Sequence, residues 1–471
     1  MDAAGEVHGR PAPDHRLVLR GQGAIRRGRD AGPPTDGAVK AVTRPLHVAF
    51  FNRSYYPDTA ATGQLLTELC ESLVSEHGCR VSVVAGVPLI PATDDGDPGP
   101  RGLVSRTLHR GVEVFRARGT RFSKRRFIGR ASNYVTYFIS ACYAGLRLDR
   151  PDVVVALTDP PIIGLAAFLA ARRFGAPFVM SYRDIFPEVA RLLEDFQSDA
   201  VERMLQAVNC FLVRRADRNV ALGETMRRRL IDGKGAPSER TIVIPDWTDC
   251  QAIVPGPKRN PFSERHGLAE KFVVMHSGNL GLSQALETLV EAADALRDVP
   301  DLEVVFVGEG VKKPALQDQA RRLGLTNVRF LPYQPQAQLT ESFATADVFV
   351  VSLKAGLSGY IVPSKLYGIL AAGRPYVSAV EEDSEVVHIA RAYDCGLVAE
   401  PGKPRSLAEQ ILAMYHDRAG ARRMGDNARR AAADFDRRPQ VSAYARLLQE
   451  LSQARGTAGL RIGADRSRGG G

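Results

Sequence analysis

Short apolar runs alternate with longer amphipathic segments along most of this chain. A run without polar interruption predicts a strand buried on both faces, and the longer segments have the three- and four-residue spacing of helices. The alternation predicts an α/β chain with parallel sheets. The predicted strands are Leu46–Phe51, Val81–Ala85, Val153–Leu157, Phe178–Tyr182, Arg218–Ala221, Thr241–Ile244, Phe272–His276, Val304–Val307, Val328–Leu331, Ala346–Leu353 and Tyr376–Val380.

The pattern breaks near the middle of the chain and at both ends. At 471 residues the chain is too long for one ordinary core, so we expect two domains. Pro245–Asp249 and the Pro/Gly-rich run Pro255–Pro261 are typical of a hinge. The predicted parts are a disordered extension (1–44, with no apolar core of a signal peptide), two domains (45–250 and 251–435), a last helix (436–453) and a disordered tail (454–471).

Composition narrows the class of protein. Hydrophobic residues make up 44% and charged residues 25%, as in a soluble globular protein, and the net charge of +10 favours phosphorylated ligands, anionic lipid or nucleic acid as partners. Six cysteines without a CxxC pair indicate neither a disulfide framework nor a zinc site, so a reducing cytoplasm fits best. The apolar stretch Val153–Ala171 is interrupted by Asp159, Pro160 and Pro161, so we do not expect it to span a membrane.

The segment Gly356–Pro375 carries the first candidate site. Pro363, Ser364 and Lys365 open a predicted helix that Gly373 can end in the left-handed conformation. The helix start follows the carboxyl end of a predicted parallel strand, where open α/β sheets bind ligands. Its unpaired N–H groups and the charge of Lys365 suit a diphosphate, although an ordinary surface lysine beside a helix cap has the same pattern.

Three further connections at the carboxyl side of the second predicted sheet contain Gly or Pro: Ser277–Gly281, Gly308–Gly310 and Pro332–Pro335. Gly63 lies in the first strand-to-helix connection of the chain, where a missing side chain lets a ligand approach the backbone. One such turn is weak evidence. Three of them together with the helix start at Lys365 favour a nucleotide site.

Two polar segments of the first half have competing interpretations. The loop Arg183–Glu188 presents one basic and two acidic residues that can meet a hydroxyl substrate, or it contains an ordinary Arg–Asp pair and helix cap. The DxD spacing in Asp94–Asp97 can hold a divalent metal in some transferases. It lies among prolines and glycines without a flanking strand, so we interpret it as a solvated loop and predict no metal site.

Seven of the fifteen residues in Arg116–Arg130 are Arg or Lys, and Phe122, Phe127 and Ile128 lie among them. Basic residues mixed with aromatic ones can lie on an anionic membrane surface. They can also follow a nucleic-acid backbone or form a solvated loop before a core helix. We favour the membrane surface, and nothing but charge supports nucleic acid.

The chain resembles glycosyltransferase family 4, over about residues 46–452. The resemblance is to the bacterial polysaccharide branch typified by colanic-acid and O-antigen fucosyl- or N-acetylfucosaminyltransferases. It implies a GT-B fold, in which two Rossmann-like domains face each other across a cleft and the last helix returns to the first domain. The motifs that carry it are YYPDTAATGQLLTELCESL (55–73), RDIFPE (183–188), HSGNLG (276–281), VGEG (307–310), FLPYQP (330–335), PSKLYGILAAGRP (363–375) and SEVVHIARAYDCGLVAEPG (384–402).

The resemblance implies roles for individual residues, and it names Lys365 and Asp184 as catalytic. Donor-binding residues would be Gly63, Asn279, Glu309, Gly310, Tyr333, Ser364, Lys365 and Glu385, and acceptor-binding residues would be Arg183, Asp184 and Glu188. Two glutamates that most family members carry are Tyr360 and Gly368 here, and Asn279 stands where the family often has arginine.

The activity that the resemblance implies is transfer of a sugar, with retained configuration, from a UDP- or GDP-sugar to a glycan or polyprenyl-diphosphate-linked acceptor. No cofactor or metal is expected, because Lys365 and the helix N-terminus would stabilise the leaving diphosphate. The enzyme is expected in the cytoplasm, on the inner face of the plasma membrane. A GT-B nucleotide-sugar epimerase and a non-catalytic nucleotide-sugar-binding scaffold are the alternatives.

Overall fold

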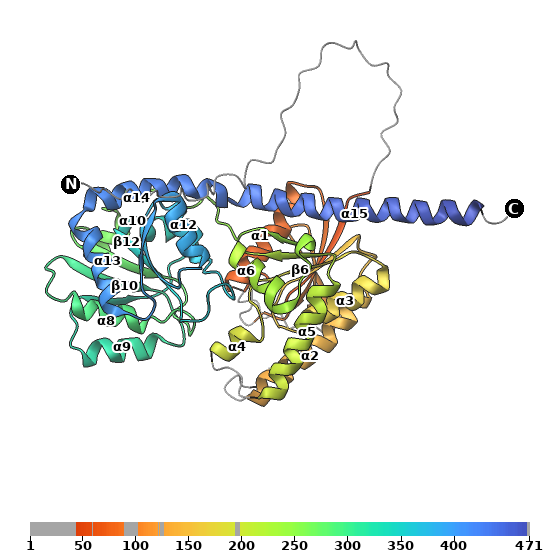
Figure 1. Cartoon of the computed structure of the whole chain (residues 1–471), viewed down its shortest axis with the longest axis horizontal. Coiled ribbons are helices and arrows are strands. Elements are labelled where there is room, and N and C mark those ends of the chain that lie inside the picture. The colour runs from red at the N-terminus through yellow and green to blue at the C-terminus, as the bar shows by residue number, and fades with distance from the viewer. Residues whose placement is uncertain are drawn as a thin grey trace, which may run out of the picture. The chain divides into compact units, whose positions relative to one another are not determined.

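The computed structural model describes residues 44–468 except 59, 89–101, 121, 123–126 and 194–197 (Figure 1). Two parallel sheets organise this part of the chain, and helices cover their faces. The predicted N-terminal extension, apart from Arg44, and the DxD segment lie outside the described residues. Among the described residues, no helix is both long enough and apolar enough to cross a membrane.

The first sheet has the strand order β3-β4-β2-β1-β5-β6-β7-β8, and every strand except β3 is parallel to its neighbours. Its central strands are fully buried, as their unbroken apolar runs predict. The strands are β1 His47–Phe51, β2 Arg80–Gly86, β3 Val104–His109, β4 Val112–Ala117, β5 Val153–Ala156, β6 Phe178–Ser181, β7 Arg218–Ala221 and β8 Thr241–Val243.

Helices of the first domain pack on both faces of this sheet, so that it has one apolar core on each side. Gly175 ends α3 in the left-handed conformation (φ 62°), in which a residue with a Cβ would be strained. The elements are α1 Ala61–Ser75, α2 Phe127–Leu146, α3 Ile163–Phe174, α4 Glu188–Leu192, α5 Asp199–Arg215, α6 Glu224–Arg228, the π-helical turn Arg229–Gly233 and the 3₁₀ turn Ser238–Arg240.

The second sheet has the order β11-β10-β9-β12-β13-β14 with all strands parallel, which is the strand order of a Rossmann fold. The order reverses between β9 and β12, and ligands of such sheets bind where it does. The strands are β9 Phe272–Ser277, β10 Leu302–Val307, β11 Val328–Leu331, β12 Val348–Ser352, β13 Tyr376–Ala379 and β14 Gly396–Ala399.

The helices of the second domain follow its strands in turn. Asn260 caps the first of them with a reciprocal capping box, and Gly373 (φ 64°) follows the end of α11 as the sequence predicts. The elements are α7 Pro261–Arg265, α8 Glu287–Ala295, α9 Lys313–Arg322, α10 Leu339–Thr345, α11 Lys365–Ala371, α12 Glu385–Tyr393, α13 Pro404–His416, α14 Arg418–Ala431, the 3₁₀ turns Gln336–Gln338 and Ala432–Phe435, and α15 Arg437–Arg468.

Helix α15 packs on the first domain. Val441, Tyr444 and Leu448 are buried in a core cluster with β1, β2 and α1, and the Tyr444 hydroxyl bonds Ser181 Oγ at 2.9 Å. The helix continues to Arg468, whereas the sequence analysis predicted a disordered tail from residue 454. The tail contains Gly456, Gly459 and Gly463, which have low helix propensity, and its disorder stays a prediction.

The β3–β4 hairpin is the main element that the sequence analysis missed. Three of the six residues of β3 are exposed and none is buried, so the strand lacks the apolar run that marked the other strands. Its partner β4 contains Arg116, which is 9% exposed, bonds Gly86 O and Tyr56 O, and lies over the Tyr55 ring. Arg116 is therefore not part of an exposed basic surface. The membrane-contact segment, predicted to begin at Arg116, must begin after it.

Candidate active site

Lys365 is the first residue of α11 and lies beside the turn that follows β9. Its Nζ is 3.0 Å from His276 Nε2, and the backbone of Gly278 is so close that an added Cβ would lie 3.6 Å from the same nitrogen. Burial lowers the pKa of Lys365 to about 7. No carboxylate among the described residues forms an ion pair with it, so the site has a cation without a counter-ion.

His276 lies under this lysine and is fully buried in the second domain. Burial and then the charge of Lys365 hold the pKa of His276 well below its ordinary value. A neutral imidazole can accept a hydrogen bond from the Lys365 ammonium, which fixes the direction of the lysine side chain.

The turns after β9 and β10 lie against each other through their backbones. A Cβ added at Gly308 (φ 150°) would lie 1.9 Å from Gly278 O, and one at Gly310 (φ 156°) would lie 2.3 Å from Leu280 O. Only glycine fits at both positions. Their small size brings two loop backbones together next to Lys365.

The other predicted donor residues lie around this edge with different partners. Asn279 is exposed in the β9 turn, and Glu309 is exposed and pairs with Lys313 at 2.6 Å. Tyr333 is 52% exposed after β11. Ser364 is the N-cap residue of α11, and its side chain makes no capping hydrogen bond.

Gly63 lies in the first turn of α1, where it is buried. An added Cβ would lie 3.3 Å from Ser54 Cβ and 3.4 Å from Tyr55 N. The missing side chain therefore lets the start of α1 pack on the loop after β1. This packing requires glycine whether or not a donor phosphate binds here.

Glu385, expected near the donor sugar, contacts the first domain instead. The Thr225 amide donates to its Oε1 at 2.6 Å, and a Cβ at Gly223 would lie 2.3 Å from its Cδ. Burial raises the pKa of Glu385, but the His388 imidazole at 3.9 Å and the hydrogen bond from the Thr225 amide outweigh burial, so the pKa lies below its usual value. The charged carboxylate thus caps the start of α6 in this structure.

Asp184 follows β6 and lies against the segment that precedes α11. Asp184 and Ile361 form an isolated antiparallel bridge, and the Ile185 amide donates to Tyr360 O at 3.0 Å. These contacts bring the carboxyl ends of the two sheets together, four residues before Lys365. The two residues predicted to be catalytic therefore lie on segments that touch.

Electrostatics set Asp184 apart from an ordinary surface carboxylate. Burial, and then the neighbouring charge of Asp159, raise the pKa of Asp184 to about 6, and Arg183 opposes the shift. The amides of Arg183 and Asp184 both donate to Thr158 Oγ1, at 3.2 and 3.3 Å. The loop is held by its backbone, which leaves the carboxyl group available to a substrate.

Sequence reasoning missed the charged neighbour of Asp184 at this edge, Asp159, and the partners of Asp159. Arg53 Nε bonds Asp159 Oδ1 at 3.1 Å, and Ser54 Oγ bonds Asp159 Oδ2 at 2.6 Å. The sequence pattern showed Asp159 only as one of three residues that interrupt an apolar stretch. One signal in the sequence could have found this cluster: a polar residue follows each of three buried strands that are adjacent in the sheet. Using that signal requires the strand order, which the sequence pattern does not give.

Arg183 and Glu188 have structural partners. Arg183 is buried and forms an ion pair with buried Asp246, next to Trp247. Glu188 pairs with Lys234 at 2.7 Å, and only 2% of the Lys234 side chain is exposed. Both predicted acceptor contacts therefore hold the first domain together, which was the alternative interpretation of the loop.

The comparisons with known proteins agree with this architecture. Residues 258–431 match the family model of glycosyl transferases group 1, and residues 61–247 match that of the glycosyl transferase 4-like domain. The crystal structure of HepE from Anabaena in complex with UDP matches 86% of this chain and 100% of its own, with a TM-score of 0.65 and 18% identity.

The chain is a glycosyltransferase of the GT-B type.

Relatives of this glycosyltransferase include proteins assigned to polysaccharide biosynthesis. WbjE of Pseudomonas aeruginosa, assigned as a glycosyltransferase, is 29% identical over 272 residues, which are 56% of this chain and 66% of WbjE. WcaI of Escherichia coli K12, assigned as a colanic acid biosynthesis glycosyl transferase, is 24% identical over 78% of this chain and 91% of its own length. The expected fucosyl or N-acetylfucosaminyl specificity stays a prediction.

The glycosyltransferase differs from the family pattern at two positions that the structure explains in part. A Cβ at Gly368 would lie 3.0 Å from Phe343 Cε2, so this position of α11 faces a helix and has no room for a glutamate. Tyr360 lies under the Arg229 guanidinium at 5.0 Å from its ring centroid. Glu381, which sequence reasoning did not single out, accepts the amides of Gly356 and Ser358 and anchors the loop before Lys365.

Among the described residues, no group of three or more His, Cys, Asp and Glu side chains is placed to hold a metal ion.

Proposed function

We propose that this enzyme transfers a sugar, with retention of configuration, from a nucleotide diphosphate sugar to a hydroxyl of a glycan or polyprenyl-diphosphate-linked acceptor. The observation that carries the proposal is Lys365, a cation without a described counter-ion at the start of α11. It adjoins backbone turns at the edge where Rossmann-type sheets bind phosphates. HepE, which shares this fold, has been crystallised with UDP and with UDP-glucose.

In the proposed reaction, Lys365 and the amides of the β9 and α11 segments stabilise the leaving diphosphate as the glycosidic bond breaks. The acceptor hydroxyl attacks from the face that the diphosphate leaves, so configuration is retained, and a diphosphate oxygen takes the proton. Asp184, on the facing segment, holds the acceptor hydroxyl. No metal is needed, because protein cations and dipoles supply the positive charge.

We also propose that the acceptor lies at an anionic membrane, on the inner face of the plasma membrane. Support comes from α2, whose exposed residues Val135, Ile139, Tyr143 and Leu146 recur at helical spacing, and from Phe122, which is 58% exposed. The four helix residues lie along one face of α2, which continues the predicted membrane-contact segment, and Phe122 lies within that segment. Conversion of lipid-linked acceptor should exceed that of the same glycan in free solution.

The deciding experiment is a turnover assay with UDP- and GDP-sugars and a lipid-linked glycan, with and without a chelator. We expect one donor class to react in the chelator, and the anomeric configuration of the product, read by NMR, to match that of the donor. Product of inverted configuration, or a strict need for divalent metal, would refute the mechanism. Donor binding without product from any acceptor would favour a scaffold.

A further inference from the structure

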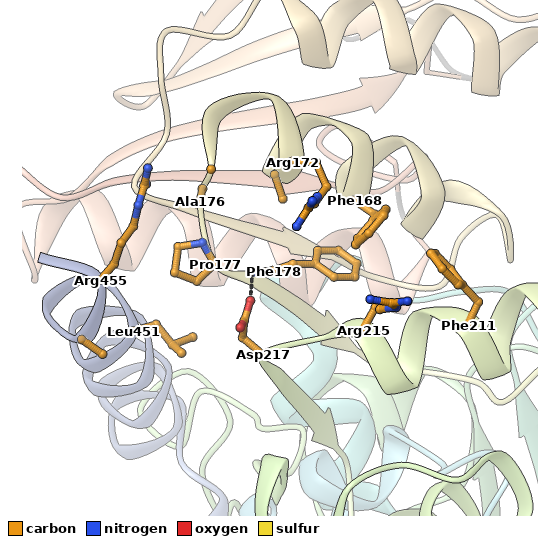
Figure 2. Close-up of a pocket in the computed structure, with 13 residues that line it drawn as sticks. Phe168, Arg172, Ala176, Pro177, Phe178, Phe211, Arg215, Asp217, Leu451 and Arg455 are labelled. Carbon is orange, nitrogen blue, oxygen red and sulfur yellow. Dashed lines mark hydrogen bonds between the residues drawn. The ribbon is translucent and has the colours of Figure 1, made fainter. Parts of the chain in front are cut away.

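A cavity of about 670 Å³ lies in the first domain at the amino-terminal ends of β6 and β7 (Figure 2). Pro177 and Asp217, which precede these strands, line it together with the last turns of α3 and α5. Leu451 and Arg455 of α15 form the remaining wall. Since Asp184 follows the carboxyl end of β6, this cavity is at the opposite edge of the sheet from the proposed active site.

The lining of the cavity is cationic. Arg172, Arg215 and Arg455 reach it from three different helices, and none forms an ion pair with a carboxylate in the described part of the chain. Arg455 donates to Phe174 O at 2.9 Å, which fixes its direction. The lining carboxylate, Asp217, accepts the Phe178 amide at 2.8 Å. Three guanidinium groups therefore outnumber one engaged carboxylate.

Aromatic rings form the apolar part of the lining. Phe168 makes edge contacts with Phe178 and Phe211, at centroid distances of 5.7 and 5.2 Å. Arg215 lies over the Phe211 ring at 5.8 Å. Figure 2 shows the Arg172 and Arg215 side chains beside these rings. Guanidinium groups suit phosphate oxygens, and the rings suit an apolar or flat body attached to that phosphate.

Arginines in the last turn of a helix also have a simpler explanation, because they offset the negative end of the helix dipole. Both helices carry a pair there, Arg172 with Arg173 and Arg214 with Arg215. Either arginine of a pair can offset the negative end of the helix dipole equally well. One member of each pair lines the cavity and the other does not, so replacing one member or the other separates a role in the cavity from the offset of the dipole.

We propose that this cavity is a second ligand site, which binds a phosphate group carried on an apolar or aromatic body. Its volume is within the range of small-molecule sites. A ligand that joins Arg455 to Arg172 and Arg215 would strengthen the packing of α15 on the first domain at the end of its contact with that domain. Because α15 follows the second domain in the chain and packs on the first, a ligand bound at this site would act on a helix that is connected to both domains.

The test compares two double variants of the full chain with equal loss of charge. Arg172→Ala/Arg215→Ala removes cavity arginines, and Arg173→Ala/Arg214→Ala removes their neighbours. Calorimetry with phenyl phosphate is one arm. Sedimentation with phosphatidylcholine vesicles, with and without phosphatidylglycerol, is the other. In at least one arm, the binding affinity of the Arg172→Ala/Arg215→Ala variant should fall about 100-fold, which is about tenfold for each guanidinium group removed. The affinity of the Arg173→Ala/Arg214→Ala control should change little.

The arm that responds identifies the source of the phosphate, soluble or lipid. Equal binding by wild type and cavity variant in both arms, or equal loss in both double variants, would overturn the proposal. Lys365→Ala separates the two sites, since it should leave cavity binding intact even if phenyl phosphate also binds at α11. Hydrogen exchange in residues 447–455 should slow when the cavity is filled.

Discussion

Replacing Lys365 by alanine tests the proposed active site most directly. Its Nζ bonds His276 and has no described carboxylate partner, so its charge is free for the diphosphate. One unit charge at about 4 Å and an effective dielectric constant of about 20 gives about 4 kcal/mol. Loss of one preorganised catalytic donor costs about 3 kcal/mol, and at about 1.4 kcal/mol per tenfold in rate we expect Lys365→Ala to lower turnover about 100-fold.

The assay is steady-state release of nucleotide from the donor identified in the turnover screen. Lys403→Ala, which removes an exposed lysine of the same domain, is the control and should keep the wild-type rate. The melting temperature of Lys365→Ala should stay close to that of wild type, because the change removes a half-buried cation without leaving a carboxylate unpaired. A near-normal rate in a folded Lys365→Ala enzyme would refute the reasoning.

The same lysine predicts a pH dependence of donor binding. Its pKa is lowered to about 7 in the free enzyme, and a bound diphosphate raises the pKa by favouring the charged form. Below pH 7 the amine is already protonated. Above pH 7 binding must take up a proton, so affinity for a UDP-sugar should fall as pH rises. Calorimetry in buffers of different ionisation enthalpy measures that proton, and a flat profile from pH 7 to 9 would contradict the assignment.

Three further predictions concern the first domain and the glycine turn. Because the pKa of Asp184 is raised to about 6, activity should fall as pH drops through 6, and Asp184→Asn should be slow and lose that acid limb; an unchanged limb would exclude Asp184 as its cause. Gly308→Ala should destabilise the fold by more than about 3 kcal/mol in urea unfolding, whereas Gly324→Ala, with φ +63° and open space, should cost about 1 kcal/mol. Arg183→Ala should cost about 3–5 kcal/mol by leaving buried Asp246 unpaired, and a loss of acceptor affinity with unchanged stability would instead restore Arg183 to the acceptor site.

Local pattern determined much of the fold. Strands such as Val153–Ala156 and the Val304–Val307 part of β10 could be located because parallel strands buried on both faces are uniformly apolar. The helix that begins near Lys365 could be located from its Ser, Lys and Gly residues. The β3–β4 hairpin could not, because an exposed edge strand lacks that signal. The length of α15 could not either, because composition alone does not determine where a helix ends.

The side-chain partners depended on the tertiary structure. Arg183 and Asp184 are adjacent in sequence, yet one is buried against Asp246 and the other adjoins Ile361 of the second domain. Strand order and domain contact decide which residues meet over such separations, and neither can be read from local periodicity. The sequence by itself therefore located the start of α11 as a candidate phosphate site, and phosphate binding there stays a prediction. Only the folded chain decided which charged residues remain free to take part, because ion pairs between distant segments neutralise the others.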